Sequence, residues 1–365
     1  MNVTQHQVNI GIIGLGGIGT SKHLPSLAKV PQARVIAFCD LEEDKAALAA
    51  KQFGADGAKV YSDYRKLLEE SAIDVVHVCT PNSSHAEITV AALEAGKHVM
   101  CEKPMAITSA DAKRMLEAAK RTGKKLTIGY QNRYRQDSLY LKQLCEMGEL
   151  GDIYYGKALA IRRRAVPTWG VFLEKDLQGG GPLIDIGTHA LDLTLWMMDN
   201  YKPVSVTGSV FHKLGGTRNA ANLWGSWDPD KFTVEDAAVG FIKMENGATI
   251  TLEASWALNT LDVREAKTVL CGTKAGADMD DSLRLNGERL GRLYDHKIRF
   301  DSAPVVFYGA QKDETPADME ARLWIECILN DTEPFVKPEQ ALVVSEILEA
   351  IYESAATGQT IYLNA

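Results

Sequence analysis

The chain has 365 residues, of which 45% are hydrophobic. Because a single core rarely grows past about 250–300 residues, this length predicts two domains. Lys and Arg total 40 against 48 Asp and Glu, a net charge of -8 with no long basic run, which argues against a nucleic acid partner.

The N-terminal residues show neither a cationic start nor an apolar stretch typical of a signal peptide. Apolar runs elsewhere are interrupted by charges well before the ~18 residues that a membrane span needs. We therefore expect a cytoplasmic protein with no membrane contact. Reduced, buried thiols are expected, rather than disulfides or a zinc site, because the six cysteines form no CxxC pair. They are Cys39, Cys79, Cys101, Cys145, Cys271 and Cys327.

A β-branched run over Val8–Ile13 predicts a strand buried on both faces. It ends at Gly14, and Gly16 and Gly19 complete a G-x-G-x-x-G spacing before a predicted helix over 22–29. In a dinucleotide site the first glycine makes the turn, the second admits the pyrophosphate and the third lets helix and strand pack closely. This glycine spacing alone is weak evidence for a dinucleotide site, so the neighbouring residues must decide whether one is present.

A second predicted strand, 34–39, ends at Asp40, about 20 residues after the glycines, where a carboxylate can accept both ribose hydroxyls. Leu41 rather than a basic residue follows, so the sequence favours NAD over NADP. Further predicted strands alternate with helices up to 127. This alternation predicts an α/β Rossmann domain over 1–127, with a doubly wound parallel sheet. The later strands are 75–79, 98–101 and 124–129, and the helices 45–52, 63–70 and 86–95.

Ligands of such sheets bind beyond the carboxyl ends of the strands. Lys103 follows one of these strands, between Glu102 and Pro104, where its long side chain can reach both the nicotinamide ribose and a substrate hydroxyl. The simpler interpretation is a solvated surface lysine. The position after a central strand favours a functional Lys103.

Beyond residue 128 the simple alternation stops, and β-type runs predict a C-terminal α+β domain with a large open, mostly antiparallel sheet. A helix is expected over 139–147. In the run 248–256 apolar and polar residues alternate, so one face meets a core and the other meets solvent or another subunit. The runs are 153–165, 204–213, 237–244, 249–258 and 267–271.

Asp185 and His189 lie four residues apart in a segment that is apolar nearly all round, which predicts a buried helix with both side chains on one face. An imidazole can accept the proton that leaves a hydroxyl as its carbon loses a hydride, and a carboxylate can orient that imidazole. A structural Asp–His pair in the core is the alternative. A metal site is not expected, because no HExxH motif or second His/Cys cluster is present.

Arginine and aromatic side chains indicate sugar contacts. Arg162–Arg164 and Trp169 precede the Asp185 segment, and Asn132 and Arg133 lie near the predicted domain junction. Guanidinium groups bind vicinal hydroxyls or carboxylates, and an indole can stack on a pyranose ring. A charged strand edge and a core tryptophan would explain the same residues without a ligand.

Several motifs in order resemble the Gfo/Idh/MocA family of NAD(P)-dependent oxidoreductases, the group of glucose-fructose oxidoreductase and inositol dehydrogenase. They are GIIGLGGIG, CTPNSSH, AGKHVMCEKP, GYQNRY, GGGPLIDIGTHALD, VEDAAV and IYESAATGQTIYL, and they span nearly the whole chain.

The resemblance implies that Lys103, Asp185 and His189 form a catalytic triad. His189 would exchange the hydroxyl proton, Lys103 would polarise the reacting oxygen and Asp185 would hold both, with no metal. It also implies a homo-oligomer, a dimer or tetramer. The cofactor residues it implies are Gly14, Gly16, Gly17, Ile18, Gly19, Asp40, Thr80, Pro81, Asn82, His85, Glu102, Lys103 and Gln131, and the substrate residues are Lys103, Asn132, Arg133, Arg163, Arg164, Trp169, Asp185 and His189.

The segment RRRAVPTWG resembles family members that oxidise glucose-type pyranosides, some of them at C3. We therefore expect oxidation of a secondary ring hydroxyl, at C3, of a sugar or glycoside. Two enzymatic alternatives stay open: an inositol (cyclitol) dehydrogenase, and glycoside cleavage or dismutation with a tightly bound, internally recycled NAD. A non-catalytic NAD(H) sensor is a third, against which the acid-base residues argue.

Overall fold

The computed structural model describes residues 7–300, 307–311 and 313–363. Two compact units are present: Met1–Gln131 with Glu314–Leu342, and Asn132–Asp313 with Val343–Ala365. The sequence predicted two continuous domains, 1–127 and 128–365. The structure differs because the segment 314–342 returns to the first unit, where its helix α9 (Pro316–Leu329) has its apolar partners.

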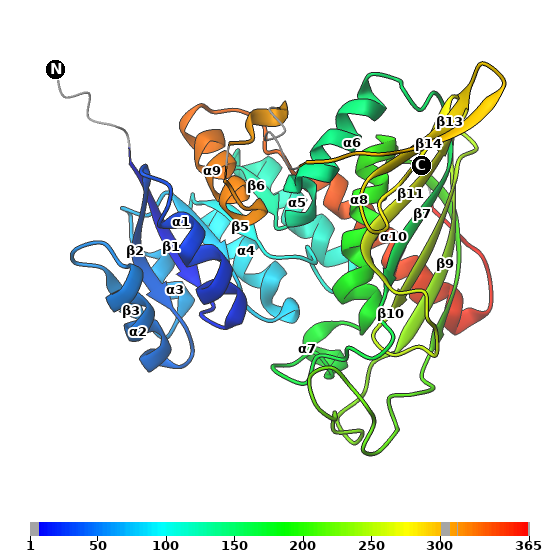
Figure 1. Cartoon of the computed structure of the whole chain (residues 1–365). Coiled ribbons are helices and arrows are strands. Elements are labelled where there is room, and N and C mark those ends of the chain that lie inside the picture. The colour runs from blue at the N-terminus through cyan, green and yellow to red at the C-terminus, as the bar shows by residue number, and fades with distance from the viewer. Residues whose placement is uncertain (1–6, 301–306, 312, 364–365) are drawn as a thin grey trace. The chain divides into compact units, whose positions relative to one another are not determined.

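The first unit contains a six-stranded parallel sheet in the order β3-β2-β1-β4-β5-β6 (Figure 1). Strand β1 coincides with the predicted run, and its side chains are buried almost throughout, as expected for a central parallel strand. The doubly wound order is confirmed. The strands are β1 Val8–Ile13, β2 Ala33–Cys39, β3 Lys59–Tyr61, β4 Val75–Val78, β5 His98–Cys101 and β6 Leu126–Ile128.

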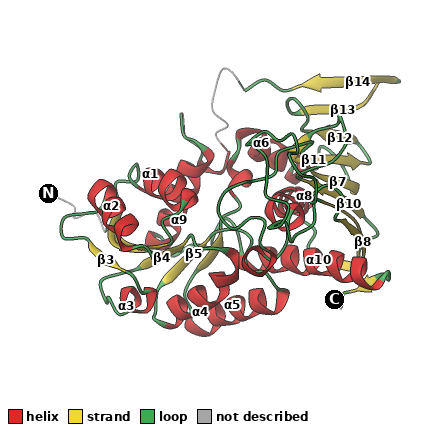
Figure 2. Cartoon of the chain, turned by 90° about the horizontal axis from the view of Figure 1, so that it is seen from below, coloured by secondary structure: helices red, strands yellow, loops and turns green. Residues whose placement is uncertain are grey.

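Helices cover both faces of this sheet (Figure 2). Helices α3, α4 and α5 lie on one side, and α1, α2 and α9 on the other. The helix predicted over 22–29 is shorter than expected, because a π-helical turn over Gly19–His23 precedes it. The helices are α1 Leu24–Leu27, α2 Glu43–Phe53, α3 Tyr64–Leu68, α4 His85–Glu94 and α5 Ser109–Thr122.

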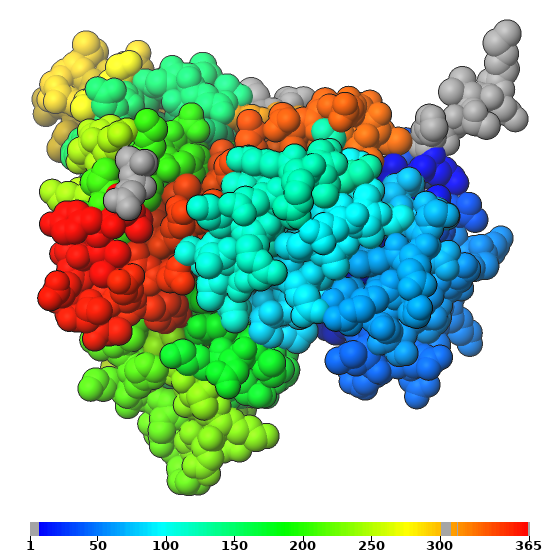
Figure 3. Space-filling model, turned by 180° about the vertical axis from the view of Figure 1, so that it is seen from behind, coloured from blue at the N-terminus to red at the C-terminus, as the bar shows by residue number. Residues whose placement is uncertain are grey.

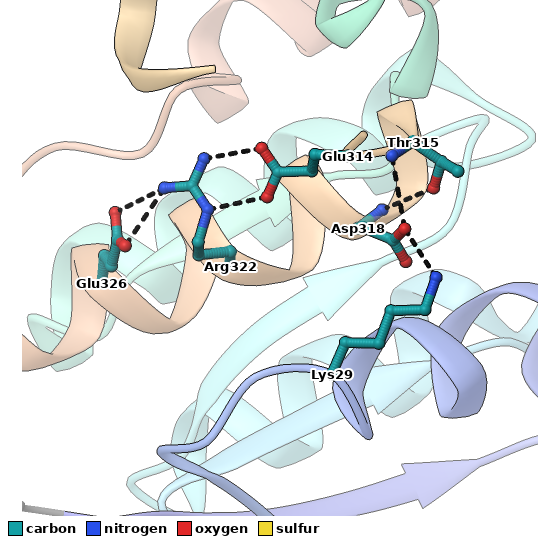
Figure 4. A network of polar contacts seen from close by, with 6 residues as sticks. All are labelled: Lys29, Glu314, Thr315, Asp318, Arg322 and Glu326. Atoms are coloured by element: carbon teal, nitrogen blue, oxygen red, sulfur yellow. Dashed lines mark hydrogen bonds and ion pairs between the residues drawn. The ribbon is translucent and has the colours of Figure 1, made fainter. Parts of the chain in front are cut away.

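Helix α9 joins the first unit through an apolar face and an ion pair. Trp324 and Ile325 are buried in the same core as Ile10 and Leu24, and each such side chain contributes about 1.5–3 kcal/mol by burial. At the start of α9, Asp318 accepts a hydrogen bond from Lys29 Nζ at 2.7 Å (Figure 4). From behind, residues 314–335 form the orange surface beside the cyan and blue segments of this unit (Figure 3). The predicted domain division missed this long-range packing.

The second unit contains a nine-stranded sheet in the order β14-β13-β12-β11-β7-β10-β9-β8-β15 (Figure 2). Strands β7 and β10 pair in parallel, and the other neighbours are antiparallel. The mostly antiparallel sheet is therefore confirmed. The strands are β7 Ile153–Ile161, β8 Pro203–Phe211, β9 Ala237–Met244, β10 Thr249–Ser255, β11 Arg264–Gly272, β12 Ala275–Asp278, β13 Arg284–Arg289, β14 Arg292–Lys297 and β15 Ile361–Tyr362.

Strand β10 shows the predicted alternation, with Ile250, Leu252 and Ala254 buried and Glu253 exposed. Its buried face packs on a π-helical turn over Leu183–Gly187 that leads into the next helix, α8. Helix α8 itself packs on β7 and β11. The helices of this unit are α6 Gln136–Glu146, α7 Lys175–Gln178 and α8 Thr188–Met198, and the division between the units falls within α10, Pro338–Thr357.

All six cysteines are free thiols, as predicted. Cys39, Cys79, Cys101 and Cys327 are buried, whereas Cys145 and Cys271 are only half-buried, which differs from the burial that the sequence predicted for all six. Among the described residues, no helix combines the length and apolar character that a membrane crossing requires.

Candidate active site

The glycine-rich turn after β1 has the shape that a dinucleotide needs. Gly14 has a positive φ of 93°, and a Cβ there would lie 2.6 Å from the Cys79 carbonyl carbon. A Cβ on Gly19 would lie 2.4 Å from the Gly14 carbonyl oxygen. At Gly16 and Gly17 a Cβ would meet nothing within 4 Å. The first and last glycines therefore allow close packing, and the middle pair leaves the main chain open to a pyrophosphate.

Asp40 follows β2 and lies against this turn. Its Oδ2 accepts a hydrogen bond from the Leu15 amide at 2.7 Å, and its Oδ1 accepts one from the Glu42 amide at 3.0 Å. The carboxylate is thereby fixed beside the glycine loop, while Leu41 is 92% exposed. A fixed carboxylate at this point fits the ribose hydroxyls of NAD. The glycines and Asp40 therefore fit the predicted cofactor.

His85, at the start of α4, joins the turns that follow two adjacent strands. Its Nε2 lies 2.9 Å from the Thr80 carbonyl oxygen and its Nδ1 lies 2.8 Å from that of Pro104. Burial lowers the pKa of His85. The ring therefore positions the segments that contain Thr80 and Lys103, and any cofactor contact by His85 stays a prediction. Of its neighbours, Pro81 is exposed and Asn82 is buried.

Glu102, directly before Lys103, lies in a buried charge cluster. Its Oε1 accepts hydrogen bonds from Lys22 Nζ at 2.7 Å and His23 Nε2 at 2.8 Å. Its Oε2 accepts one from the Lys103 main-chain amide at 3.1 Å. Burial alone would raise the pKa of Glu102, but Lys22 and His23 outweigh it and hold that pKa well below its usual range. Glu102 is therefore ionised and ties Lys103 to the interior of the first unit. Lys103 itself is half-buried.

Asp185 lies in the π-helical turn of the second unit. It is 6% exposed, and its Oδ2 accepts a hydrogen bond from Trp256 Nε1 at 3.0 Å. Trp256 follows β10 and is completely buried. A bulge of this kind, which is frequent at functional sites, departs from the α-helical spacing that the sequence predicted. His189 lies in the first turn of α8 and is half-buried. The predicted contact between Asp185 and His189 stays a prediction.

Glu235 holds the start of the Asp185 segment. Its two carboxylate oxygens accept hydrogen bonds from the Gly181 amide at 2.9 Å, the Leu183 amide at 3.1 Å and the Tyr352 hydroxyl at 2.8 Å. Burial raises the pKa of Glu235. A Cβ on Gly180 would lie 2.0 Å from the Tyr352 hydroxyl oxygen, so the glycine run leaves room for this arrangement.

The predicted substrate residues have different surroundings. Arg163 and Trp169 are exposed, and Arg164 is half-buried and donates a hydrogen bond to Asn259 Oδ1 at 2.6 Å. The Trp169 ring meets Trp224 edge-on, with centroids 4.9 Å apart. Asn132 is half-buried. Arg163, Trp169 and Asn132 therefore retain access to solvent in differing degrees.

Arg133 requires a correction. It is completely buried, and its guanidinium forms a two-point ion pair with Asp192 of α8, with Nε 2.9 Å from Oδ2. Such planar pairing gives the N–H donors and the positive charge of a buried guanidinium a partner. Arg133 thus has a structural role inside the second unit, in place of the substrate contact that the sequence predicted. The sequence could not indicate that Asp192 lies opposite.

Sequence reasoning missed the residues that support the predicted triad: Lys22, His23, Glu235, Trp256, Glu320 and Tyr352. Lys22 and His23 lie close after the glycine motif, and Glu235 lies in the VEDAAV run. Motifs in the sequence could therefore have drawn attention to these three residues. The others are distant in sequence from the groups they support. Among the described residues no group of His, Cys, Asp and Glu side chains could hold a metal ion.

Two family models match the chain. The oxidoreductase family with an NAD-binding Rossmann fold matches residues 8–130, and the GFO/IDH/MocA C-terminal domain matches residues 138–278.

Known proteins of similar length also match. The chain is 35% identical over 364 residues to a D-glucoside 3-dehydrogenase of Escherichia coli K12, covering 99% of each chain. It is 35% identical over 199 residues to an inositol 2-dehydrogenase of Salmonella typhimurium LT2, covering 54% of this chain and 56% of that one. A crystal structure of the aldose-aldose oxidoreductase of Caulobacter crescentus, 26% identical, superposes with a TM-score of 0.78 over 98% of this chain and 100% of the other.

The family models, the full-length relative and the glycine turn with Asp40 agree on the first unit as a nucleotide-binding domain. The chain therefore belongs to the Gfo/Idh/MocA family of oxidoreductases, and its first unit is an NAD-binding Rossmann domain.

Proposed function

We propose that this enzyme oxidises a secondary ring hydroxyl, at C3, of a glucoside to the 3-keto sugar. The observation that carries this proposal is the 35% identity over 99% of the chain to a D-glucoside 3-dehydrogenase. Identity that runs through both units includes the part of the chain that would select the sugar. The inositol relative matches over only about half of the chain.

Bound NAD⁺ supplies the hydride acceptor for this reaction. Gly14, Gly16, Gly17, Ile18 and Gly19 would hold its pyrophosphate, and Asp40 would hold its adenosine ribose. The carboxylate of Asp40 favours NAD over NADP, because a 2′-phosphate would meet an anion, and the next residue in the chain, Leu41, is exposed and apolar rather than basic. Thr80, Pro81, Asn82 and Gln131 complete the proposed cofactor contacts.

His189 would accept the proton of the reacting hydroxyl, and Lys103 would donate a hydrogen bond to the reacting oxygen. Asp185, itself fixed by Trp256, would orient them. A positioned general base is worth about 10²–10⁴-fold in rate. The support for these roles is the family's motif pattern in this sequence, together with the buried setting of Asp185 and the tie between Glu102 and Lys103.

Arg163, Arg164, Trp169 and Asn132 are proposed sugar contacts. The exposed Trp169 offers an aromatic face of the kind on which pyranose rings stack. Arg164 offers guanidinium donors for vicinal hydroxyls.

An internally recycled cofactor is a second candidate. It is favoured by the likeness to the aldose-aldose oxidoreductase, whose name describes a reaction between two sugars. In that case the purified protein would retain NAD and would act on sugar pairs without added NAD⁺. Inositol oxidation is the third candidate, since inositol 2-dehydrogenases share the identity quoted above over half of the chain.

We also propose a homo-oligomer that forms on the open face of the second sheet. Three apolar side chains point outward there from β8 and β9: Phe211, Val239 and Phe241 are each about two-fifths exposed. An apolar face of this kind marks a protein contact. The location in the cytoplasm is a separate prediction, and the six free thiols fit such a reducing compartment. Light scattering of the purified protein tests the oligomer, and a monomer at all concentrations would contradict it.

The test of the activity is NADH formation at 340 nm with methyl glucosides, glucose, galactose and myo-inositol, with denatured protein checked for released nucleotide. The proposal expects the fastest turnover with a glucoside and a ketone at C3 of the product. Turnover only with inositol would contradict it. Retained nucleotide without NADH release would favour the recycled cofactor.

A further inference from the structure

The buried cluster around Glu102 continues to a small cavity. From Glu102, His23 leads to His77 of β4, with the two Nδ1 atoms 2.9 Å apart. In the other direction, Lys22 Nζ also contacts Glu320 Oε2 of α9 at 2.7 Å. His77 is 1% exposed and Glu320 is 2% exposed. Both arms of the cluster end at one cavity, which is lined by His77, Glu320 and Trp324 among others.

Three buried polar atoms of that lining have no protein partner among the described residues: His77 Nε2, Glu320 Oε1 and Trp324 Nε1. A buried polar atom without a hydrogen bond costs about 1–3 kcal/mol. Three such atoms on one cavity therefore point to a common ligand. The volume in which the centre of a water molecule can lie is about 10 Å³. This is close to the minimum for a cavity that holds one water molecule.

The hydrogen-bond roles of the three atoms restrict the ligand. Glu102 is ionised, so His23 Nε2 carries a hydrogen and donates it. A single hydrogen lies between His23 Nδ1 and His77 Nδ1, so one of these two atoms donates and the other accepts. Burial, with His23 and Lys22, lowers the pKa of His77 well below its ordinary value, so His77 is neutral. A neutral His77 carries one ring hydrogen, so its Nε2 accepts a hydrogen bond where Nδ1 donates, and donates one where Nδ1 accepts.

Trp324 Nε1, by contrast, can only donate. A metal cation or ammonium ion cannot accept from this indole, whereas water accepts from the indole and can either donate to His77 Nε2 or accept from it. Burial raises the pKa of Glu320 although Lys22 opposes this. Water fits either protonation state of Glu320, because it both donates and accepts.

We propose that the first unit contains a structural water site formed by His77, Glu320 and Trp324. The water closes a hydrogen-bonded ring through Glu320, Lys22, Glu102, His23 and His77, and thereby links α9 to the Lys103 main chain. Lys22, Glu102, His77, Glu320 and Trp324 are positioning residues for Lys103. The catalytic meaning of this link rests on the proposed function, while the water site itself does not.

The first test is a high-resolution crystal structure of the full chain. We expect one ordered water within about 2.7–3.2 Å of all three atoms. An empty cavity, a direct bond between His77 Nε2 and Glu320, or a density peak with metal or anion geometry would overturn the proposal. This test needs no activity, so a failure of the proposed function leaves its result unaffected.

The second test measures hydrogen exchange of the Lys103 amide in the full chain. Trp324→Phe keeps an aromatic side chain but removes the donor, and we expect exchange about tenfold faster at this amide. Glu320→Gln keeps a polar side-chain end that can form a hydrogen bond with the water. The Lys103 amide should therefore retain most of its protection from exchange in this variant. Lys29→Met, which breaks the contact of Asp318 in α9 with the turn that follows α1, is the matched control and should leave exchange at Lys103 unchanged.

Turnover gives a further readout. Trp324→Phe should lower kcat several-fold with the KM for NAD⁺ changed less than twofold, because the variant moves Lys103 and leaves the glycine turn intact. Equal protection at Lys103 in wild type and Trp324→Phe, or an unchanged kcat, would overturn the positioning role. A wild-type protein that holds the water but oxidises no sugar would contradict the proposed function alone.

Discussion

The supports of Lys103 and of Asp185 are built from different chemistry. In the first unit, Glu102 is surrounded by charged and ionisable groups, Lys22, His23 and Glu320. In the second, Asp185 accepts a hydrogen bond from the neutral indole of Trp256 and lies near enough to Arg162 for their charges to interact, and Glu235 is held by two main-chain amides and a hydroxyl. Removing one partner from a buried charge cluster leaves an uncompensated charge. The first support should therefore be the more sensitive to loss of charge at Lys22 or Glu102, and the second the more sensitive to shape.

The cofactor side of the first unit and the Asp185 segment of the second also differ in how well the sequence predicted them. The glycine turn, Asp40 and Lys103 follow strands directly, so short-range patterns place them. Asp185 was found as a buried polar residue, but Trp256, Glu235 and Tyr352 reach its segment from remote parts of the chain. No local pattern encodes such contacts. The same reason explains the missed return of α9 and the misassigned Arg133, whose partner Asp192 lies on another helix.

The largest effect is expected from His189→Ala. Without the general base, turnover should fall about 10²–10⁴-fold, because the proton of the hydroxyl has no acceptor. NAD⁺ affinity, measured by calorimetry, should stay within about twofold of wild type. Turnover close to the wild-type rate would remove His189 from the proposed mechanism.

Trp256→Phe tests the neutral support in the second unit. Loss of the indole donor leaves a buried carboxylate without one of its hydrogen bonds, so kcat should fall about 10- to 100-fold. Tyr155→Phe is the matched control, because it removes the contact of Tyr155 with Thr251 in the same sheet and should leave kcat unchanged. Equal rates in the two variants would contradict a role for Trp256 in holding Asp185.

A smaller effect concerns the pH dependence of stability in the first unit. Burial, with Lys124 and Lys125, lowers the pKa of His98 to about 4, and its Nδ1 accepts the Lys125 amide at 3.0 Å. Between pH 6.5 and 4 the unfolded chain protonates this histidine and the folded chain does not. The difference between the two pKa values corresponds to about 3 kcal/mol, and solvent screens part of it because His98 is only half-buried. The free energy of unfolding should therefore fall by about 1–2 kcal/mol as the pH drops through this range.

His98→Asn keeps an acceptor and cannot titrate, so urea unfolding of this variant should lose that part of the pH dependence. An identical pH dependence in wild type and variant would show that His98 has the same pKa in the folded and unfolded chain, and would contradict this prediction.

The smallest effect is expected for Lys29→Met at the α9 contact of Figure 4. Lys29 is 61% exposed, so its pair with Asp318 is screened by water. The variant should change the free energy of unfolding by about 0–1 kcal/mol. A loss of several kcal/mol in denaturant titrations would mean that this surface pair, rather than the buried core, attaches α9.

The most direct measurement of the central claim uses methyl glucoside deuterated at C3, incubated with the enzyme and NAD⁺. Hydride transfer from C3 predicts that deuterium appears in the reduced nicotinamide, that turnover slows relative to the unlabelled sugar, and that the product carries its ketone at C3. Turnover with the deuterium retained in the sugar would contradict oxidation at that carbon.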